Sequence, residues 1–277
     1  MTPDMIDNPN ELAALAETAA RTAAPALRAA FRSDMDISFK RDAHDVVTEH
    51  DREAERVISE VLQSGAPGSQ ILGEETGSSG EARLRWIIDP IDGTANFARG
   101  LAYWCISIAA EVDGEVVAGV VLDPMADHLF SAGADEATLD GTPLRSASAP
   151  DDRSTLLTSF PNQHDVDLLG DAAFELLAQI TAGYQHHHST GSGALNLVHV
   201  AAGWSDATMG FDTSPWDVAA GAYILRRAGG SYAGFREGVA VDRPQNSLDY
   251  VAMGAGGDHT ALITRVRELS AHWFPAA

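Results

Sequence analysis

The sequence predicts an α/β protein of the α+β type, in which two stacked halves meet near residue 150. Two observations predict this fold. Residues 1–150 show helical patterns followed by short apolar strands and hairpin turns, whereas residues 151–277 alternate short strands with helices. The small, polar stretch "SASAPDDRS" (146–154) separates the two patterns, and the sequence has no evident internal repeat or low-complexity linker. We therefore expect an N-terminal and a C-terminal half that share an extensive interface.

Two helices are predicted to open the N-terminal half. An alanine-rich segment at about 10–31 has helical spacing, and Pro25 within it is expected to cause a kink. A second helix should begin after Thr48 and end at Gly65, because its apolar residues form one stripe at helical spacing. The residues of this stripe are Ala54, Val57, Ile58, Val61 and Leu62.

Short strands and tight turns are predicted next. "QILG" (70–73) and "LRWIID" (84–89) have the length and apolar character of buried strands. Asp113-Gly114 lies between two apolar runs and predicts a two-residue hairpin, and Asp140-Gly141 predicts another turn. In the C-terminal half we expect strands at 155–160, 184–188, 206–209 and 250–254, and helices near 167–180, 193–202, 216–228 and at the end of the chain.

The composition is that of a globular protein, with 45% hydrophobic and 21% charged residues. Because 18 basic residues face 40 acidic ones, the formal net charge is −22, and we expect neither nucleic acid nor membrane as a partner. The N-terminal sequence has no secretory pattern and no apolar run is long enough to span a membrane, so we expect a cytoplasmic protein. The single cysteine, Cys105, lies in an apolar run and is expected to be buried and unreactive.

The most informative functional pattern lies in "WIIDPIDGTANFARG" (86–100). Asp89 and Asp92 follow an apolar strand, where repulsion between two like charges is costly unless a cation lies between them. A turn imposed by the intervening proline can direct both carboxylates and the Ile91 carbonyl to one side, and such hard oxygen ligands suit Mg²⁺. If a helix begins after Gly93, its first N–H groups form an adjacent anion site. An Asx turn followed by a capped helix would explain the same residues without any ligand.

Three further acids are candidates to complete this site. Glu74 follows a short strand in "ILGEETG", although an acid at a strand end is often only solvated. Asp217 lies in the first turn of a predicted helix; the helix dipole alone would favour it there, but the neighbouring tryptophan indicates a partly buried carboxylate that needs a partner. Asp51 follows Thr48 at the spacing of a capping box, and it could also orient a catalytic hydroxyl such as that of Thr94.

Five stretches carry a family resemblance: "DVVTEHD" (45–51), "GEE" (73–75), "DPIDGT" (89–94), "TGSGALNL" (190–197) and "WD" (216–217). Taken together, they resemble the inositol monophosphatase family. The resemblance runs in the order of the family from about Lys40 to Gly230, roughly two-thirds of the chain. That family comprises Mg²⁺-dependent, Li⁺-sensitive phosphatases with a layered αβαβα sandwich, usually homodimeric. The resemblance implies this fold, a homodimer and a small phosphorylated metabolite as substrate.

The resemblance also implies which residues hold metal ions. Glu74, Asp89 and the Ile91 carbonyl would hold one Mg²⁺. Asp89, Asp92 and Asp217 would hold a second, a third and weaker ion would lie near Glu74, and Mn²⁺ would serve as a substitute. Asp92 would also contact the substrate.

Further positions are assigned by the same resemblance to the phosphate, the water and the substrate. Gly93 and Thr94 would bind the phosphate. Glu74 and Thr94, the latter supported by Asp51, would position and activate the attacking water, and Gly193 would offer its backbone to the substrate. Two adjacent cations can activate a water and stabilise the leaving oxygen, so no phosphoenzyme is required.

Two other sequence families fit the motif poorly. Haloacid-dehalogenase-type phosphatases carry an aspartate nucleophile in a D-x-D-G-T motif, and the corresponding position here is Pro90. An EF-hand calcium loop would need a twelve-residue ligand pattern closed by a glutamate, which does not follow Asp89.

The substrate itself is left open by the sequence. Gly210 stands where inositol-cleaving members carry a glutamate that contacts sugar hydroxyls, and Asp212 would be either its substitute or a solvated loop acid. His188 stands where many relatives have an arginine, whose guanidinium fork an imidazole cannot reproduce. Fructose 1,6-bisphosphate, histidinol phosphate and 3′-phosphoadenosine 5′-phosphate therefore remain alternative substrates, with inositol specificity in doubt.

Two alternatives of another kind fit the sequence less well. A transition-metal site at His186–His188 is disfavoured, because alternate side chains of a strand point to opposite faces. A non-catalytic, metal-stabilised binding or regulatory protein of the same fold is also conceivable. The side chains expected to carry catalysis argue against it, since all of them are present: Glu74, Asp89, Asp92, Thr94 and Asp217.

Overall fold

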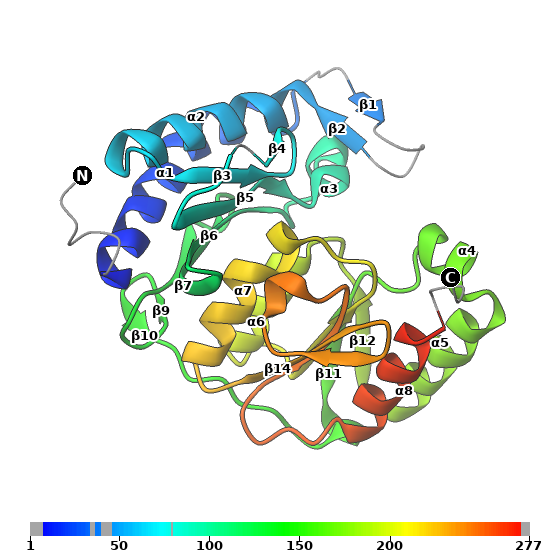
Figure 1. Cartoon of the computed structure of the whole chain (residues 1–277). Helices are drawn as coiled ribbons and strands as arrows, with labels where there is room; N and C mark the ends of the chain where they lie inside the picture. The colour runs from blue at the N-terminus through cyan, green and yellow to red at the C-terminus, as the bar shows by residue number, and fades with distance from the viewer. Residues whose placement is uncertain (1–7, 34–36, 40–45, 79, 273–277) are drawn as a thin grey trace.

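A computed structural model describes residues 8–33, 37–39, 46–78 and 80–272. Its elements stack in alternating layers: a helix pair, an eight-stranded sheet, a second helix pair, a six-stranded sheet and an outer group of helices (Figure 1). The α/β class and the αβαβα sandwich expected from the sequence are thus confirmed.

The outer helix pair consists of α1 (Pro9–Ala30) and α2 (Glu49–Gly65), which cover one face of the first sheet. α1 contains Pro25 within its bounds. Thr48 caps α2 and the helix ends at Gly65, both as predicted, and the apolar stripe of α2 packs into the core below it. Just before α2, β1 (Ile37–Phe39) and β2 (Val46–Thr48) form a small antiparallel pair.

The first sheet has the strand order β10-β9-β8-β7-β6-β5-β3-β4. Both predicted Asp-Gly turns are present, and Asp113 (φ 53°) and Gly114 (φ 83°) have the positive φ angles that tight hairpins require. The strand β8 was not predicted from the sequence, because the turn before it has no Asp-Gly or Asn-Gly signal. The strands are β3 (Gln70–Gly73), β4 (Gly77–Ser78), β5 (Leu84–Asp92), β6 (Cys105–Val112), β7 (Glu115–Asp123), β8 (His128–Ala132), β9 (Thr138–Leu139) and β10 (Thr142–Pro143).

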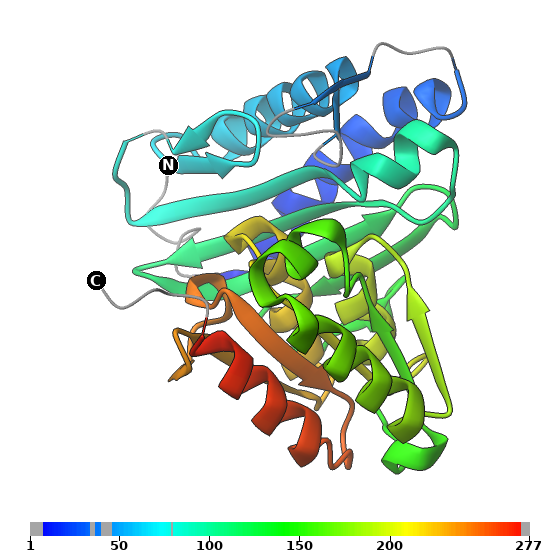
Figure 2. The same ribbon diagram turned by 90° about the vertical axis from the view of Figure 1, so that its right-hand side faces the viewer.

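The central helices α6 (Gly193–Ala201) and α7 (Pro215–Arg227) lie between the two sheets (Figures 1 and 2). Their apolar side chains share one core with strands of both sheets. α7 approaches the first sheet so closely that a Cβ at Gly119 would lie 2.8 Å from the carbonyl oxygen of Ala220. The halves therefore share an extensive interface, while their division into separate domains near residue 150 stays a prediction.

The second sheet has the order β12-β11-β13-β16-β14-β15, in which β12, β11 and β13 are parallel and the other pairings are antiparallel. Its outer face is covered by α5 and α8. The strands are β11 (Thr155–Thr158), β12 (His186–Ser189), β13 (Ala207–Gly210), β14 (Ser231–Arg236), β15 (Val239–Val241) and β16 (Asp249–Met253), and the helices are α4 (Gln163–Leu169), α5 (Asp171–Gly183) and α8 (Thr260–Ser270).

Two features of this half differ from the sequence prediction. The single helix expected near 167–180 is two helices, because Gly170 adopts φ 55° and ψ −133° between α4 and α5. The hairpin of β14 and β15 was missed, although Glu237-Gly238, with φ angles of 54° and 71°, forms its turn. The first difference arises from the backbone conformation of one glycine, and the second from a two-residue turn in which both φ angles are positive.

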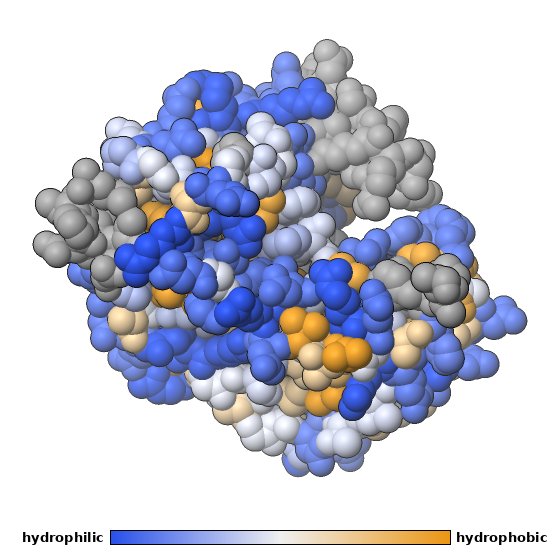
Figure 3. Space-filling view, viewed as in Figure 1, coloured by the Kyte–Doolittle hydropathy of each residue, from blue (hydrophilic) through white to orange (hydrophobic). Residues whose placement is uncertain are grey.

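The visible surface is largely hydrophilic, with apolar side chains confined to small patches (Figure 3). This agrees with the strongly acidic composition. Among the helices of the described residues, none has both the length and the apolar character needed to cross a membrane. Cys105 is fully buried, as expected.

Candidate active site

Asp89 and Asp92 lie at an irregularity near the end of β5. The strand runs to Asp92, further than predicted, but its pairing with β6 shifts register between these two aspartates. Pro90 lies within this irregularity, where a missing N–H is tolerated, and the Ile91 N–H donates to Asp89 Oδ1 at 3.0 Å. The Asx-type turn that the sequence offered as a ligand-free alternative is thus present inside a distorted strand end, next to the other acids.

Three of the predicted acids meet at this strand end. One carboxylate oxygen from each of Asp89, Asp92 and Asp217 lies within 4.8 Å of the others. Asp217 reaches the cluster from the first turn of α7, where its Oδ2 also accepts the Ser214 N–H at 2.7 Å. Residues far apart in the sequence therefore gather in one place, as the sequence reading required.

Glu74 is the fourth acid of the cluster. It lies in the loop between β3 and β4 and its side chain contacts Asp89. Burial raises the pKa of Asp89 well above its usual range, and the charges of Glu74, Asp92 and Asp217 raise it further. The pKa of Asp217 is likewise raised by burial and then by Asp92 and Glu74. A buried cluster of carboxylates whose charges disfavour one another fits divalent cations with oxygen ligands.

Asp92 is held by residues that the sequence reading did not assign to it. Ser192 Oγ donates to Asp92 Oδ2, and so does the Ala194 N–H at 2.8 Å. The Gly193 N–H lies 3.3 Å from Asp92 Oδ1. Burial raises the pKa of Asp92, and these donors at the start of α6 lower it again. Gly193, expected to face the substrate, therefore also points its N–H at this carboxylate; the N-cap position of Ser192 was the available signal.

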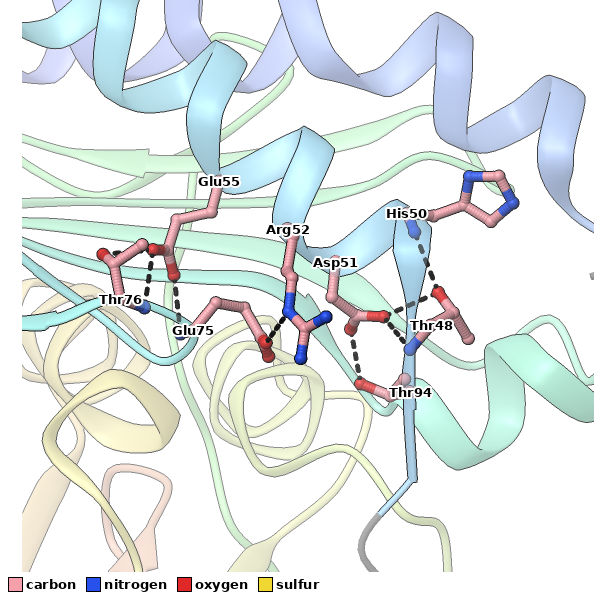
Figure 4. A network of polar contacts seen from close by, with 8 residues as sticks. All are labelled: Thr48, His50, Asp51, Arg52, Glu55, Glu75, Thr76 and Thr94. Atoms are coloured by element: carbon pink, nitrogen blue, oxygen red, sulfur yellow. Dashed lines mark hydrogen bonds and ion pairs between the residues drawn. The ribbon is translucent and has the colours of Figure 1, made fainter. Parts of the chain in front are cut away.

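Thr94 and Asp51 form a hydrogen-bonded pair beside the cluster (Figure 4). The Thr94 Oγ1 lies 2.9 Å from Asp51 Oδ1 and 2.9 Å from the Ile91 carbonyl oxygen. The other oxygen of Asp51 accepts the N–H of Thr48 at 2.8 Å and its hydroxyl at 2.7 Å. Both alternatives considered for Asp51 therefore hold together: it completes the capping box of α2 and it orients Thr94.

The turn after Asp92 brings a helix start to the same place. Gly93 adopts φ 98° and precedes α3 (Thr94–Arg99), as predicted. A Cβ at Gly93 would lie 3.0 Å from the Tyr103 carbonyl oxygen, so both the φ angle and the packing favour glycine. The first N–H groups of α3 have no acceptor within the helix, which fits the expected contact with an anion.

A cavity of about 220 Å³ opens beside Asp92 and Asp217. Its walls include Asp165 and Asp212, and no lysine, arginine or histidine among the described residues lines it. Asp212 lies at its exposed side and binds His164 at 2.7 Å. Burial raises the pKa of Asp165 to about 6. The part of the site beyond the acid cluster is therefore acidic as well.

His188 lies away from this cavity. It is exposed on β12 and lines a separate hollow of about 570 Å³, together with Leu101 and Trp204. The His187 ring lies 3.2 Å from the Thr181 hydroxyl, so it turns away from His186 and His188. Among the described residues the histidine run forms no group of metal-binding side chains.

Comparison with known protein families shows to which family the chain belongs. The model of the inositol monophosphatase family matches residues 8–271. The chain belongs to this family. The resemblance noted in the sequence is thus confirmed.

Individual members of the inositol monophosphatase family are similar over most of their length. The chain is 38% identical to the Nus factor SuhB of Pseudomonas aeruginosa, over 80% of this chain and 84% of that one. The structure superposes on the extragenic suppressor protein SuhB of Bartonella henselae with a TM-score of 0.81 and 28% identity, covering 92% and 96% of the two chains. The Thermotoga maritima IMPase gives a TM-score of 0.79 at 29% identity, covering 91% and 95%.

Proposed function

We propose that the chain is a Mg²⁺-dependent phosphomonoesterase that hydrolyses a small metabolite or polyol phosphate by direct attack of water. The observation that carries this proposal is the convergence of Glu74, Asp89, Asp92 and Asp217 beside the Thr94–Asp51 pair. Family membership supports the same reaction class.

The acids have distinct roles in this proposal. Glu74, Asp89 and the Ile91 carbonyl would hold one cation, and Asp89, Asp92 and Asp217 a second. The Ile91 oxygen lies near the Thr94 hydroxyl, but a carbonyl has two lone pairs, so one remains for a metal. When bound, the cations would acidify a water and stabilise the charge on the leaving oxygen. A third, weaker Mg²⁺ near Glu74 and substitution by Mn²⁺ belong to the same proposal.

The protein groups would orient the phosphate and the water. The N–H groups of Gly93 and Thr94 belong to the start of α3 and would bind phosphate oxygens. The Thr94 hydroxyl donates its single proton in a hydrogen bond to Asp51 or to the Ile91 carbonyl, so its oxygen can accept a hydrogen bond from a water molecule and orient it. Glu74 would take up the proton that the water loses.

The acidic cavity favours one class among the open substrates. A second phosphate in the cavity would meet Asp165 and Asp212 and no basic side chain of the described residues. A monophosphate with a neutral or cationic alcohol part fits better, which places polyol phosphates and histidinol phosphate ahead of fructose 1,6-bisphosphate and 3′-phosphoadenosine 5′-phosphate. Gly210 has no carboxylate for a sugar diol, so Asp212 is the candidate for that contact.

A kinetic substrate panel tests the proposal. Phosphate release from these four substrate types is measured with millimolar Mg²⁺ and again with EDTA. We expect Mg²⁺-dependent turnover of the monophosphates and a lower kcat/KM for substrates with a second phosphate. The proposed phosphatase is contradicted if no substrate of the panel releases phosphate and EDTA changes nothing. If bisphosphates are hydrolysed as efficiently as monophosphates, only the proposed substrate class is contradicted.

A second candidate function is a non-catalytic role, and the name of the SuhB relatives as Nus factors favours it. That name also bears on the expectation of no nucleic-acid partner, which stays a prediction supported by the charge of −22. The two functions separate with an inactive variant: Asp89→Asn should abolish phosphatase activity, and we expect it to leave a Nus role intact when the chain replaces a SuhB relative in cells. The expected homodimer is tested by light scattering of the purified chain.

A further inference from the structure

Glu55 is a buried acid of α2 that none of the roles above uses. Only 1% of its surface is exposed. Its side chain points from α2 toward the loop that carries Glu74, where the close view shows it between Thr76 and Glu75 (Figure 4). A carboxylate so fully removed from water needs several hydrogen-bond donors, and the loop provides them.

The loop in question is the tip of the hairpin formed by β3 and β4. Gly73 pairs with Gly77, so Glu74, Glu75 and Thr76 make up the whole tip. Glu55 Oε2 accepts the N–H of Glu75 at 2.8 Å, and Oε1 accepts both the N–H of Thr76 at 3.0 Å and its hydroxyl at 2.6 Å. One carboxylate therefore holds two of the three tip residues.

The remaining residue of the tip is fixed from the other side. The Glu74 N–H donates to the Ile88 carbonyl oxygen at 3.2 Å, just before Asp89 on β5. Glu55 comes so close that a Cβ at Gly73 would lie 2.4 Å from its carboxyl group, which explains a glycine at this position. Contacts on both sides thus direct the Glu74 side chain toward Asp89.

The same helix also holds the other part of the site. Asp51 precedes Glu55 by four residues, and side chains at this spacing lie on one face of a helix. Both are buried, and Asp51 holds the Thr94 hydroxyl while Glu55 holds the Glu74 loop. The spacing of two carboxylates along one rigid helix therefore sets the spacing of two groups of the proposed active site.

We propose that Glu55 is a positioning residue: through the backbone of Glu75 and Thr76 it directs the Glu74 carboxylate toward Asp89 and thereby sets the affinity of the site for divalent cations. This inference rests on the proposed metal-dependent function. Hydrogen bonds to a charged acceptor are the stronger kind, and residues that hold a metal ligand in place typically change metal affinity 10- to 100-fold when they are replaced.

The decisive variant is Glu55→Gln in the full chain. Glutamine keeps the size of the side chain but replaces one of its acceptor oxygens by an NH₂ group that cannot accept the loop N–H. We expect the Mg²⁺ dissociation constant, measured by titration calorimetry, to rise about tenfold or more. Glu53→Gln is the matched control, because Glu53 lies on the same helix with an exposed side chain bound to Arg56, and it should leave the dissociation constant unchanged.

A double-mutant cycle separates positioning from general damage. If Glu55 acts through Glu74, Glu55→Gln should weaken Mg²⁺ binding in the wild type and have no further effect in a Glu74→Gln background. A variant that removes less, Thr76→Val, deletes only the hydroxyl donor and should raise the dissociation constant by about fivefold, the equivalent of one ordinary hydrogen bond. This variant carries the test if Glu55→Gln does not fold.

The outcomes are distinct. Folded Glu55→Gln with unchanged Mg²⁺ affinity, or an equal loss in both backgrounds, overturns the positioning role even if the enzyme is an active, Mg²⁺-dependent phosphatase. For a variant that does not fold, an unchanged dissociation constant in Thr76→Val overturns it. A wild-type chain that binds no Mg²⁺ and ignores EDTA overturns the proposed function itself.

Discussion

The acid cluster predicts that Asp217→Asn stabilises the metal-free protein while it removes the response to Mg²⁺. Asparagine keeps an amide oxygen that can accept the Ser214 N–H, so the capping contact of α7 is preserved. The substitution removes one negative charge whose oxygen lies within 4.8 Å of those of Asp89 and Asp92. At an effective dielectric constant of about 20, each such pair repels by roughly 3 kcal/mol.

Part of this repulsion is relieved in the metal-free wild type. The pKa values of Asp89 and Asp217 are both raised, so protonation removes some of the charge. We therefore expect the free energy of unfolding to increase by about 1–3 kcal/mol in the variant, less than the roughly 6 kcal/mol of two full pairs. In the presence of Mg²⁺ the order should reverse, because the wild type gains binding energy that the variant lacks.

Urea unfolding in EDTA and in millimolar Mg²⁺ measures both effects, and phosphate release is followed in parallel. We expect turnover of Asp217→Asn to fall sharply, because the second cation stabilises the leaving oxygen. The reasoning is refuted if the metal-free variant is less stable than the wild type while both respond equally to Mg²⁺. Near-normal activity would remove Asp217 from the metal ligands.

Three further predictions concern other parts of the molecule. Thr94→Val should lower kcat about 100-fold with little change in KM, whereas Thr94→Ser should retain most activity, and steady-state kinetics would contradict the role of the hydroxyl if both behaved alike. Asp212→Arg should raise kcat/KM for a bisphosphate about tenfold relative to a monophosphate, because none of the described residues that line the cavity is basic and the arginine would supply a cation; an unchanged ratio speaks against the charge argument. Burial lowers the pKa of His199 to about 4 from an ordinary 6.5, so the unfolded chain binds this proton first and stability is lost as the pH falls from about 6.5 to 4. Urea titrations at about pH 6.5 and pH 4 measure this loss in the free energy of unfolding, and His199→Gln should reduce it by up to about 3 kcal/mol. An unchanged pH dependence of stability in the variant would contradict the prediction.

Local signals explain which elements were predictable. The capping residue of α2 and the Asp-Gly turns act within a few residues, so their sequence patterns translate directly into backbone conformation. The division of the helix expected near 167–180 depends on one glycine conformation, and the missed hairpin depends on a Glu-Gly turn with a weaker sequence preference.

The site was predictable to a different degree. Asp89 and Asp92 could be read from their spacing, but no spacing rule states that Asp217 folds against them; the family resemblance supplied that expectation. The sequence did not predict that the Ser192 hydroxyl donates to Asp92, nor that Glu55 accepts the N–H of Glu75. Both hydrogen bonds depend on how α6 and α2 pack against the first sheet. The one sequence feature that indicated a buried Glu55 is its spacing: it follows Asp51 by four residues, in line with the buried stripe of α2.

Asp92 belongs to a strand of the first sheet, yet it is held by the start of α6, which follows β12 at the edge of the second sheet. A divalent ion bound there would consequently act as a tether between segments on either side of residue 150. A fragment ending near that residue would retain three of the four acids and lose the tether. In limited proteolysis of the intact chain, cleavage sites in both sheets should then become more resistant together as Mg²⁺ occupancy rises.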